Sequence, residues 1–216
     1  MSLKITNIGK LVTYNPSSGK VEESTKQEIF ISDDRIAKIG NDVGEAENVV
    51  NAGNGLVTPG FVDSHTHPVF AEVRSEAFAL RAEGKSYQEI AADGGGILST
   101  VRGVCHASED ELVEKVFTRL EKFLALGTTT LEAKSGYGLS VKDELKSLRA
   151  RKRASQRSEV DVVPTFLGAH DFPAEYRDRR DEYISLICEE MIPAVTAENL
   201  AEYCDVFCEK GWFDLE

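Results

Sequence analysis

The stretch Thr58-Pro59-Gly60-Phe61-Val62-Asp63-Ser64-His65-Thr66-His67-Pro68 decides how the rest of the chain is interpreted. Its Pro-Gly turn leads into the apolar pair Phe61-Val62, which we interpret as the start of a buried strand. Side chains alternate along a strand, so His65 and His67 share one face, roughly 7 Å apart. Pro68 has no N–H to donate, so we expect the strand to end there. The pair can bind one metal ion, although a lone histidine on a strand is more often a structural hydrogen-bonding residue.

Composition limits the classes of function that are open to this chain. It has 216 residues, 41% of them hydrophobic, and a formal net charge of −12. Phosphates would be repelled over most of such a surface, so we expect neither a nucleic-acid nor an anionic-membrane partner. No apolar run reaches the roughly 18 residues of a membrane helix, and the start Met1-Ser2-Leu3-Lys4 lacks a signal-peptide apolar region. We therefore expect a cytoplasmic protein.

Residues 1–57 are predicted to form a small β domain, part of a β-sandwich. Short apolar runs alternate with turn residues, and no helical period is present. The predicted strands are Leu3–Ile8, Leu11–Tyr14, Glu28–Ile31, Arg35–Ile39 (joined to the preceding one across Asp33-Asp34) and Val49-Val50.

From Thr58 to Glu216 the pattern alternates between strand and helix, which predicts right-handed β-α-β crossovers and a parallel sheet. Only about four β/α units fit, whereas a full (β/α)₈ barrel takes about 250 residues. The predicted fold is thus α/β, a partial TIM-type barrel preceded by the small β domain. Expected strands are 128–133, 160–167 and 205–207; expected helices start at the capping boxes of Ser86 and Ser108, at Val141, and at Asp181, the last interrupted by Pro193.

The four cysteines form no C-x-x-C pair. Cys204 and Cys208 are four residues apart in an apolar stretch that we expect to be a strand. In a reducing compartment we expect all four cysteines to be small buried hydrophobic residues rather than metal ligands.

Polar residues follow three of the predicted parallel strands, at the end where barrels place their chemistry. His65 and His67 end the first, with Arg74 in the following loop; Tyr137 follows the second and His170 the third. Each has a structural alternative: an ion pair of Arg74 with Glu72 or Glu76, a loop contact for Tyr137, and a strand-end hydrogen bond for His170. Lys134, at a strand end, is expected to be structural, and the face taken by Glu132 is left open.

Several segments together resemble the imidazolonepropionase family of the amidohydrolase superfamily. They are Thr58–Pro68, the loop of Arg74, 94–100 (GGGILST), 134–139 (KSGYGL) and 166–170 (FLGAH). The resemblance implies that His65 and His67 bind one divalent metal, Zn or Fe, and that Arg74, Tyr137 and His170 contact the substrate, 4-imidazolone-5-propanoate. It also implies an acid/base carboxylate and further metal ligands for which this chain, ending at Glu216, has no counterpart.

The function expected from this resemblance is metal-dependent hydrolysis of the cyclic amide to N-formimidoyl-L-glutamate, in histidine degradation. Catalytic metal sites usually have at least three protein ligands, so we expect these 216 residues alone to bind metal weakly and not to turn over. We expect a homo-oligomer, a dimer. Two alternatives stay open: another deaminase or cyclic amidase of the superfamily, and a non-catalytic half-barrel that binds a partner.

Overall fold

A computed structural model describes residues 1–86, 89 and 96–214 of the chain. It divides into two compact units, Met1–Gly60 and Phe61–Glu216, each described here by itself. The expected helix from Ser86 to the glycines at 94–96 lies almost wholly outside the described residues. Ser86 and Glu89 do form the two hydrogen bonds of the predicted capping box, with Ser86 N donating to Glu89 Oε2 at 2.8 Å and Glu89 N to Ser86 Oγ at 3.2 Å.

The first unit contains two small sheets. One has the strand order β5-β4-β1-β6 and the other β3-β2-β7. At the turn between β4 and β5, Asp33 and Asp34 both have positive φ (51° and 62°), the geometry of a two-residue hairpin turn. The bounds are β1 Ser2–Thr6, β2 Lys10–Asn15, β3 Lys20–Ser24, β4 Glu28–Ser32, β5 Arg35–Gly40, β6 Asn48–Asn51 and β7 Leu56–Val57.

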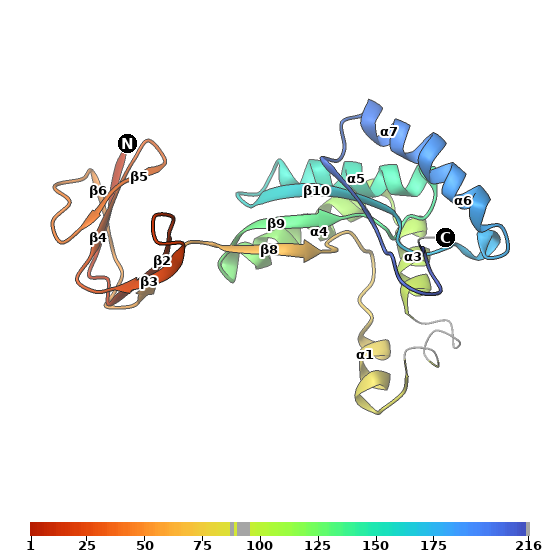
Figure 1. Ribbon diagram of the computed structural model, residues 1–216, viewed down its shortest axis with the longest axis horizontal. Helices are drawn as coiled ribbons and strands as arrows, with labels where there is room; N and C mark the ends of the chain where they lie inside the picture. Colours follow the sequence, from red (N-terminus) through yellow and green to blue (C-terminus); the bar gives the residue numbers. More distant parts are fainter. Residues whose placement is uncertain (87–88, 90–95, 215–216) are drawn as a thin grey trace. The chain divides into compact units, whose positions relative to one another are not determined.

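The second unit has a parallel sheet with the order β11-β10-β9-β8, curled as half of a barrel (Figure 1). Its strands are β8 Phe61–Thr66, β9 Thr128–Lys134, β10 Asp161–Ala169 and β11 Tyr203–Val206. Its helices are α1 Ser75–Ala82, α3 Ile97–His106, α4 Glu109–Ala125, α5 Val141–Ser155, the 3₁₀ turn Ala174–Tyr176, α6 Arg180–Leu186, the π-helix Ile187–Met191 and α7 Ile192–Ala197. The predicted fold class is confirmed.

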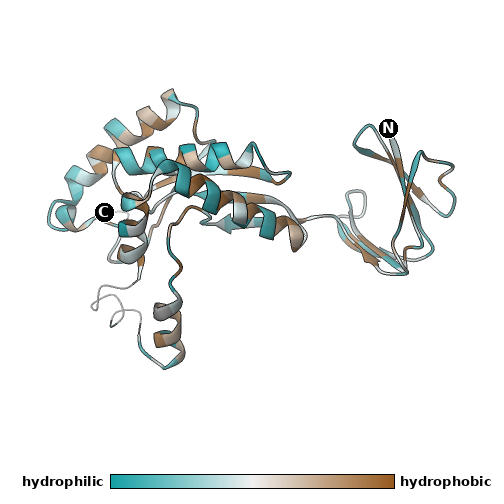
Figure 2. Cartoon of the chain, turned by 180° about the vertical axis from the view of Figure 1, so that it is seen from behind, coloured by the Kyte–Doolittle hydropathy of each residue, from teal (hydrophilic) through white to brown (hydrophobic). Residues whose placement is uncertain are grey.

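Helices cover one face of this sheet, and the side chains between the helices and the sheet form a hydrophobic core. Leu112, Val116 and Leu120 of α4 are fully buried, and they belong to the same cluster as Leu131 and Ala133 of β9. Figure 2 shows the helices on this side with hydrophilic residues on their outer surfaces. Because side chains alternate along β9, the residues between and after this buried pair point to the opposite face of the sheet, which in a barrel is the interior.

The start of β8 is exposed, contrary to the expected buried strand. Phe61 is 57% and Val62 70% exposed. The reason is that β8 is the edge strand of an open sheet in the described part of the chain, so nothing there covers its free side.

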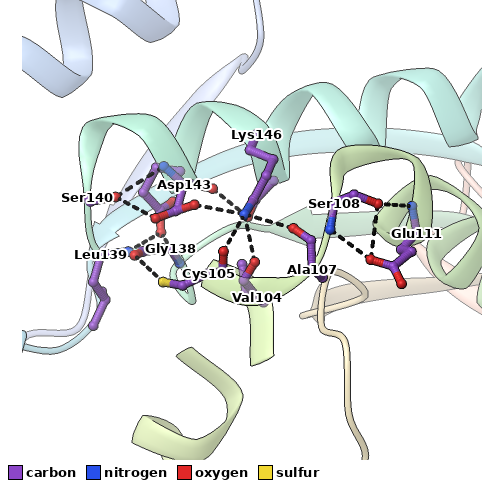
Figure 3. A network of polar contacts seen from close by, with 12 residues as sticks. Val104, Cys105, Ala107, Ser108, Glu111, Gly138, Leu139, Ser140, Asp143 and Lys146 are labelled. Carbon is purple, nitrogen blue, oxygen red and sulfur yellow. Dashed lines mark hydrogen bonds and ion pairs between the residues drawn. The ribbon is translucent and has the colours of Figure 1, made fainter. Parts of the chain in front are cut away.

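The C-terminal end of α3 is held by a lysine from α5. Lys146 Nζ donates to the carbonyls of Val104, Cys105 and Ala107 at 2.8, 3.1 and 3.0 Å and pairs with Asp143 at 2.8 Å (Figure 3). These bonds satisfy carbonyls that the end of a helix leaves without partners. Lys146 therefore fixes α3, whose first residue lines the cleft described below.

Two further expectations, on the cysteines and on Asp181, were wrong. All four cysteines are exposed, and Cys208 lies beyond β11; Cys204 is exposed because β11 is the edge strand of the described sheet. Asp181 lies in the first turn of α6, whose N-cap is Arg179. The expected interruption near Pro193 is present: α6 is followed without a gap by the π-helix, and α7 with Pro193 in its first turn begins directly after it.

No helix in the described ranges combines the length and apolarity needed to cross a membrane.

Candidate functional site

The end of β8 brings His65 and His67 together. Thr66 Oγ1 donates to the carbonyl of Glu132 at 2.6 Å, which fixes this end of β8 against β9. The rings of His65 and His67 lie with their centroids 5.5 Å apart. Thr66 is buried, whereas His65 is exposed and His67 partly buried. The alternation of the strand thus places both imidazoles on one side, as the sequence predicted.

Tyr137 and His170 join His67 from the ends of the next two strands. The ring of His67 stacks on His170 at 4.7 Å and lies 5.1 Å from Tyr137, and Tyr137 lies 5.2 Å from His170. His170 Nδ1 lies 2.8 Å from the carbonyl oxygen of Gly136. Since a carbonyl can only accept, Nδ1 carries the hydrogen and Nε2 is the nitrogen available to a ligand.

These three rings line a cleft of about 450 Å³, to which the start of α1 contributes Arg74. The remaining lining residues are Ala77, Phe78, Arg81, Gly96 and Ile97. Sequence analysis missed Phe78 and Arg81. They follow Arg74 by four and seven residues, a spacing that places all three on one face of a helix, but α1 itself was not predicted.

Burial keeps two of the imidazoles uncharged at neutral pH. It lowers the pKa of His67 to about 3, and the charges of His170 and His65 act in the same direction. Burial also lowers the pKa of His170, against the effect of its bond to Gly136. A neutral imidazole is the form that binds a metal ion or accepts a hydrogen bond.

The residues present fit part of a metal site. His67 Nδ1 is buried and has no hydrogen-bond partner, so this nitrogen is able to bind a ligand. His65 lies beside it and adds a second imidazole. No cluster of three or more histidine, cysteine, aspartate or glutamate side chains that could hold a metal occurs among residues 1–86, 89 and 96–214. The described residues therefore offer two ligands, and Zn or Fe would need at least one more.

Lys134 is held between two carboxylates on the barrel-interior side of the sheet. Its Nζ lies 2.6 Å from Glu132 Oε1 and 2.8 Å from Asp205 Oδ2. Burial works against the charge of Lys134, but the bonds to Asp205 and Glu132 outweigh it and raise the pKa. Glu132 therefore takes the same face as Lys134, and the lysine connects β9 to β11 across β10.

A parallel, helix-covered half-barrel with two histidines at the end of its first strand has the architecture of part of an amidohydrolase-type hydrolase. Solved structures of this fold are similar to this chain. The 5-methylcytosine deaminase of Klebsiella pneumoniae matches with a TM-score of 0.57 and 15% identity over 95% of this chain and 51% of its own. A mutant atrazine chlorohydrolase of Arthrobacter aurescens TC1, complexed with zinc and atraton, matches with a TM-score of 0.53 and 18% identity, over 76% and 35%.

Curated imidazolonepropionases are similar to this chain over its whole length. That of Symbiobacterium thermophilum is 46% identical over 230 residues, and that of Clostridium tetani 42% over 226. These alignments cover 100% and 98% of this chain and 54% of each relative, so the chain spans about half the length of the relatives it matches. No family model matches. The resemblance to imidazolonepropionases of the amidohydrolase superfamily is confirmed.

Proposed function

We propose that this chain forms part of an imidazolonepropionase, which hydrolyses 4-imidazolone-5-propanoate to N-formimidoyl-L-glutamate. The observation that carries the proposal is the single cleft lined by His67, Arg74, Tyr137 and His170, in a chain whose relatives bear that name. In the reaction, the oxygen of water forms a bond to the lactam carbonyl carbon. The C–N bond breaks, and the leaving ring nitrogen takes up a proton.

The residues of the cleft suit the two ends of this substrate. The guanidinium of Arg74 can bind the propionate carboxylate through two parallel hydrogen bonds, and Arg81 adds a second positive charge to the same cleft. Tyr137 can donate a hydrogen bond to the lactam oxygen as charge develops on it, and His170 can bond to the ring through Nε2.

His65 and His67 would hold the divalent ion, zinc or iron. When bound, the ion supplies Lewis acidity, which polarises a carbonyl and lowers the pKa of water toward about 7. The protein groups of the cleft would bind and orient the substrate whether or not the ion is present. We expect the acid/base carboxylate outside these 216 residues, and we expect the protein to be a cytoplasmic dimer.

The experiment is a chimaera in which this chain replaces the matching half of the Symbiobacterium thermophilum relative. Loss of the ultraviolet absorbance of imidazolone propionate would support the proposal. Release of ammonia from another cyclic substrate, with no loss of imidazolone propionate, would favour a deaminase instead. The isolated 216-residue chain should be inactive and bind metal weakly, and measured turnover by it would contradict that expectation.

The carboxylate-binding role is tested by Arg74→Ala in the same chimaera. Losing a hydrogen-bonded charge pair of about 1.5–3 kcal/mol should raise KM roughly 10- to 100-fold. Arg35→Ala, which removes an exposed guanidinium from the first unit, is the matched control and should leave KM unchanged. An unchanged KM in Arg74→Ala would remove Arg74 from the site.

A further inference from the structure

Glu144, near the start of α5, is a fully buried carboxylate that the proposed reaction does not use. Its two oxygens accept hydrogen bonds from the loop that carries Tyr137. Oε1 accepts from the backbone N–H of Gly138 at 2.7 Å and of Leu139 at 3.0 Å, and Oε2 accepts from that of Gly136 at 3.1 Å. One side chain thus satisfies three loop amides.

The surroundings of Glu144 suit its charged form. The hydroxyl of Ser135 also bonds to the carboxyl group, and the three backbone amides that contact it can only donate. Burial raises the pKa of Glu144, and these four donors oppose that rise. The N-terminal turn of α5 adds its positive helix dipole. A buried carboxylate with this many donors stabilises one loop conformation, since any other leaves a charge without partners.

The same loop sets the orientation of His170. Gly136, whose N–H is bonded to Glu144, presents its carbonyl to Nδ1 of His170 at 2.8 Å. The loop also lies tightly against β10: a Cβ on Gly136 would lie 2.8 Å from the carbonyl oxygen of Leu167. A shift of the loop would therefore break the bond that makes Nδ1 the protonated nitrogen.

Tyr137 is fixed by the same carboxylate. It lies between Gly136 and Gly138, both of whose amides are bonded to Glu144, so its Cα has little freedom. Its side chain is only 7% exposed and contacts the rings of His67 and His170. Both residues that the proposed function assigns to the ring end of the substrate thus depend on one acid in the helix behind them.

We propose that Glu144 is a positioning residue, which holds the Ser135–Leu139 loop so that Tyr137 faces the cleft and His170 offers Nε2 to the substrate. This role deepens the proposed function and rests on it, because the proposed function supplies the substrate that Tyr137 and His170 contact. Its geometric content, the single tautomer of His170 and the bonded loop amides, can be measured without any substrate.

The experiment is nitrogen-15 NMR of the histidine side chains and hydrogen exchange of the loop amides in the 216-residue chain at neutral pH. In the wild type, His170 should carry its proton on Nδ1, and the amides of Gly136, Gly138 and Leu139 should exchange slowly. In Glu144→Gln the carboxamide offers one acceptor oxygen where the carboxylate offers two. His170 should then become a mixture of tautomers, and loop-amide exchange should accelerate roughly 10- to 100-fold.

Asp143→Asn is the matched control. It removes the adjacent carboxylate from the same helix end, but the side chain of Asp143 bonds to Ser140, Lys146 and Cys105 rather than to the amides of Gly136, Gly138 or Leu139 (Figure 3), so His170 and the loop amides should be unchanged. A folded Glu144→Gln variant with an unaltered His170 tautomer would overturn the proposal. Should that variant not fold, the wild type decides: a proton on Nε2 of His170, or fast exchange of the three amides, would overturn it. Hydrolysis by the chimaera can succeed or fail independently of these readings.

Discussion

Replacing Gly136 by alanine should destabilise the second unit more than the same change at Gly84, a turn glycine with open space around it. Gly136 has a φ of +107°, and an added Cβ would lie 2.8 Å from Leu167 O and 2.9 Å from His170 Nδ1. Gly84 provides the matched control, because its φ is +97° and a Cβ there meets nothing within 4 Å. The two variants share the backbone strain and differ in the contacts.

The size of the difference follows from those contacts. The positive φ costs alanine about 1–2 kcal/mol at either position. At Gly136, pushing aside a backbone oxygen adds about 1–3 kcal/mol, and losing the bond to His170 adds about 1 kcal/mol. The free energy of unfolding should therefore fall by about 1–2 kcal/mol in Gly84→Ala and by about 3–6 kcal/mol in Gly136→Ala.

Urea unfolding followed by tryptophan fluorescence measures both variants. Trp212 is the one tryptophan of the sequence, and it packs against the core of the second unit, so the signal reports on that unit. If the two variants lost the same free energy of unfolding to within about 0.5 kcal/mol, the close packing of Gly136 against Leu167 of β10 would be contradicted.

Three further predictions concern the packing and charge of the second unit. Leu112→Ala empties a fully buried site under α4 and should cost about 2–5 kcal/mol in the same urea assay. Arg119→Met removes the guanidinium that lies over the ring of Phe70 and donates to the carbonyls of Pro68 and Phe70, so it should cost about 1–3 kcal/mol; an unchanged urea midpoint would contradict this. Burial raises the pKa of Asp143, but bonds to Lys146 and Ser140 outweigh it and leave the pKa lowered. The stability advantage of wild type over Asp143→Asn should thus be full near pH 5 and disappear as the pH falls below about 4, whereas an advantage that grew on acidification would contradict it.

Local signals were enough to predict the elements with clear starts and stops. The capping box of Ser108 and Glu111 marks the start of α4, and the structure contains both of its hydrogen bonds. The helices α1 and α3 were missed because neither N-cap, Arg74 or Gly96, makes a side-chain capping bond, so the sequence carries no start signal. β3 was missed because its residues are polar and all exposed, which leaves no apolar alternation.

The candidate site was predictable only in part. His65, His67, Tyr137 and His170 could be found because each lies at or just beyond the end of a strand, and parallel strands bring their carboxyl ends to one edge. The dependence of that edge on Glu144 could not be found, since a glutamate in the first turn of a helix ordinarily faces solvent. The exposure of Cys204 could not be found either, because it depends on β11 being an edge strand of the sheet rather than on local sequence.

The order in which the parts of this chain can form follows from the spacing of their strand partners. In the first unit β2 and β3 pair through Asn15 and Lys20, whereas in the second Phe61 of β8 must wait for Thr128 of β9. Closing the longer loop costs about 2 kcal/mol more in chain entropy. On a ribosome the hairpins of the first unit can therefore form while β8 is still without a neighbour, and the site is assembled only after β9 has been made.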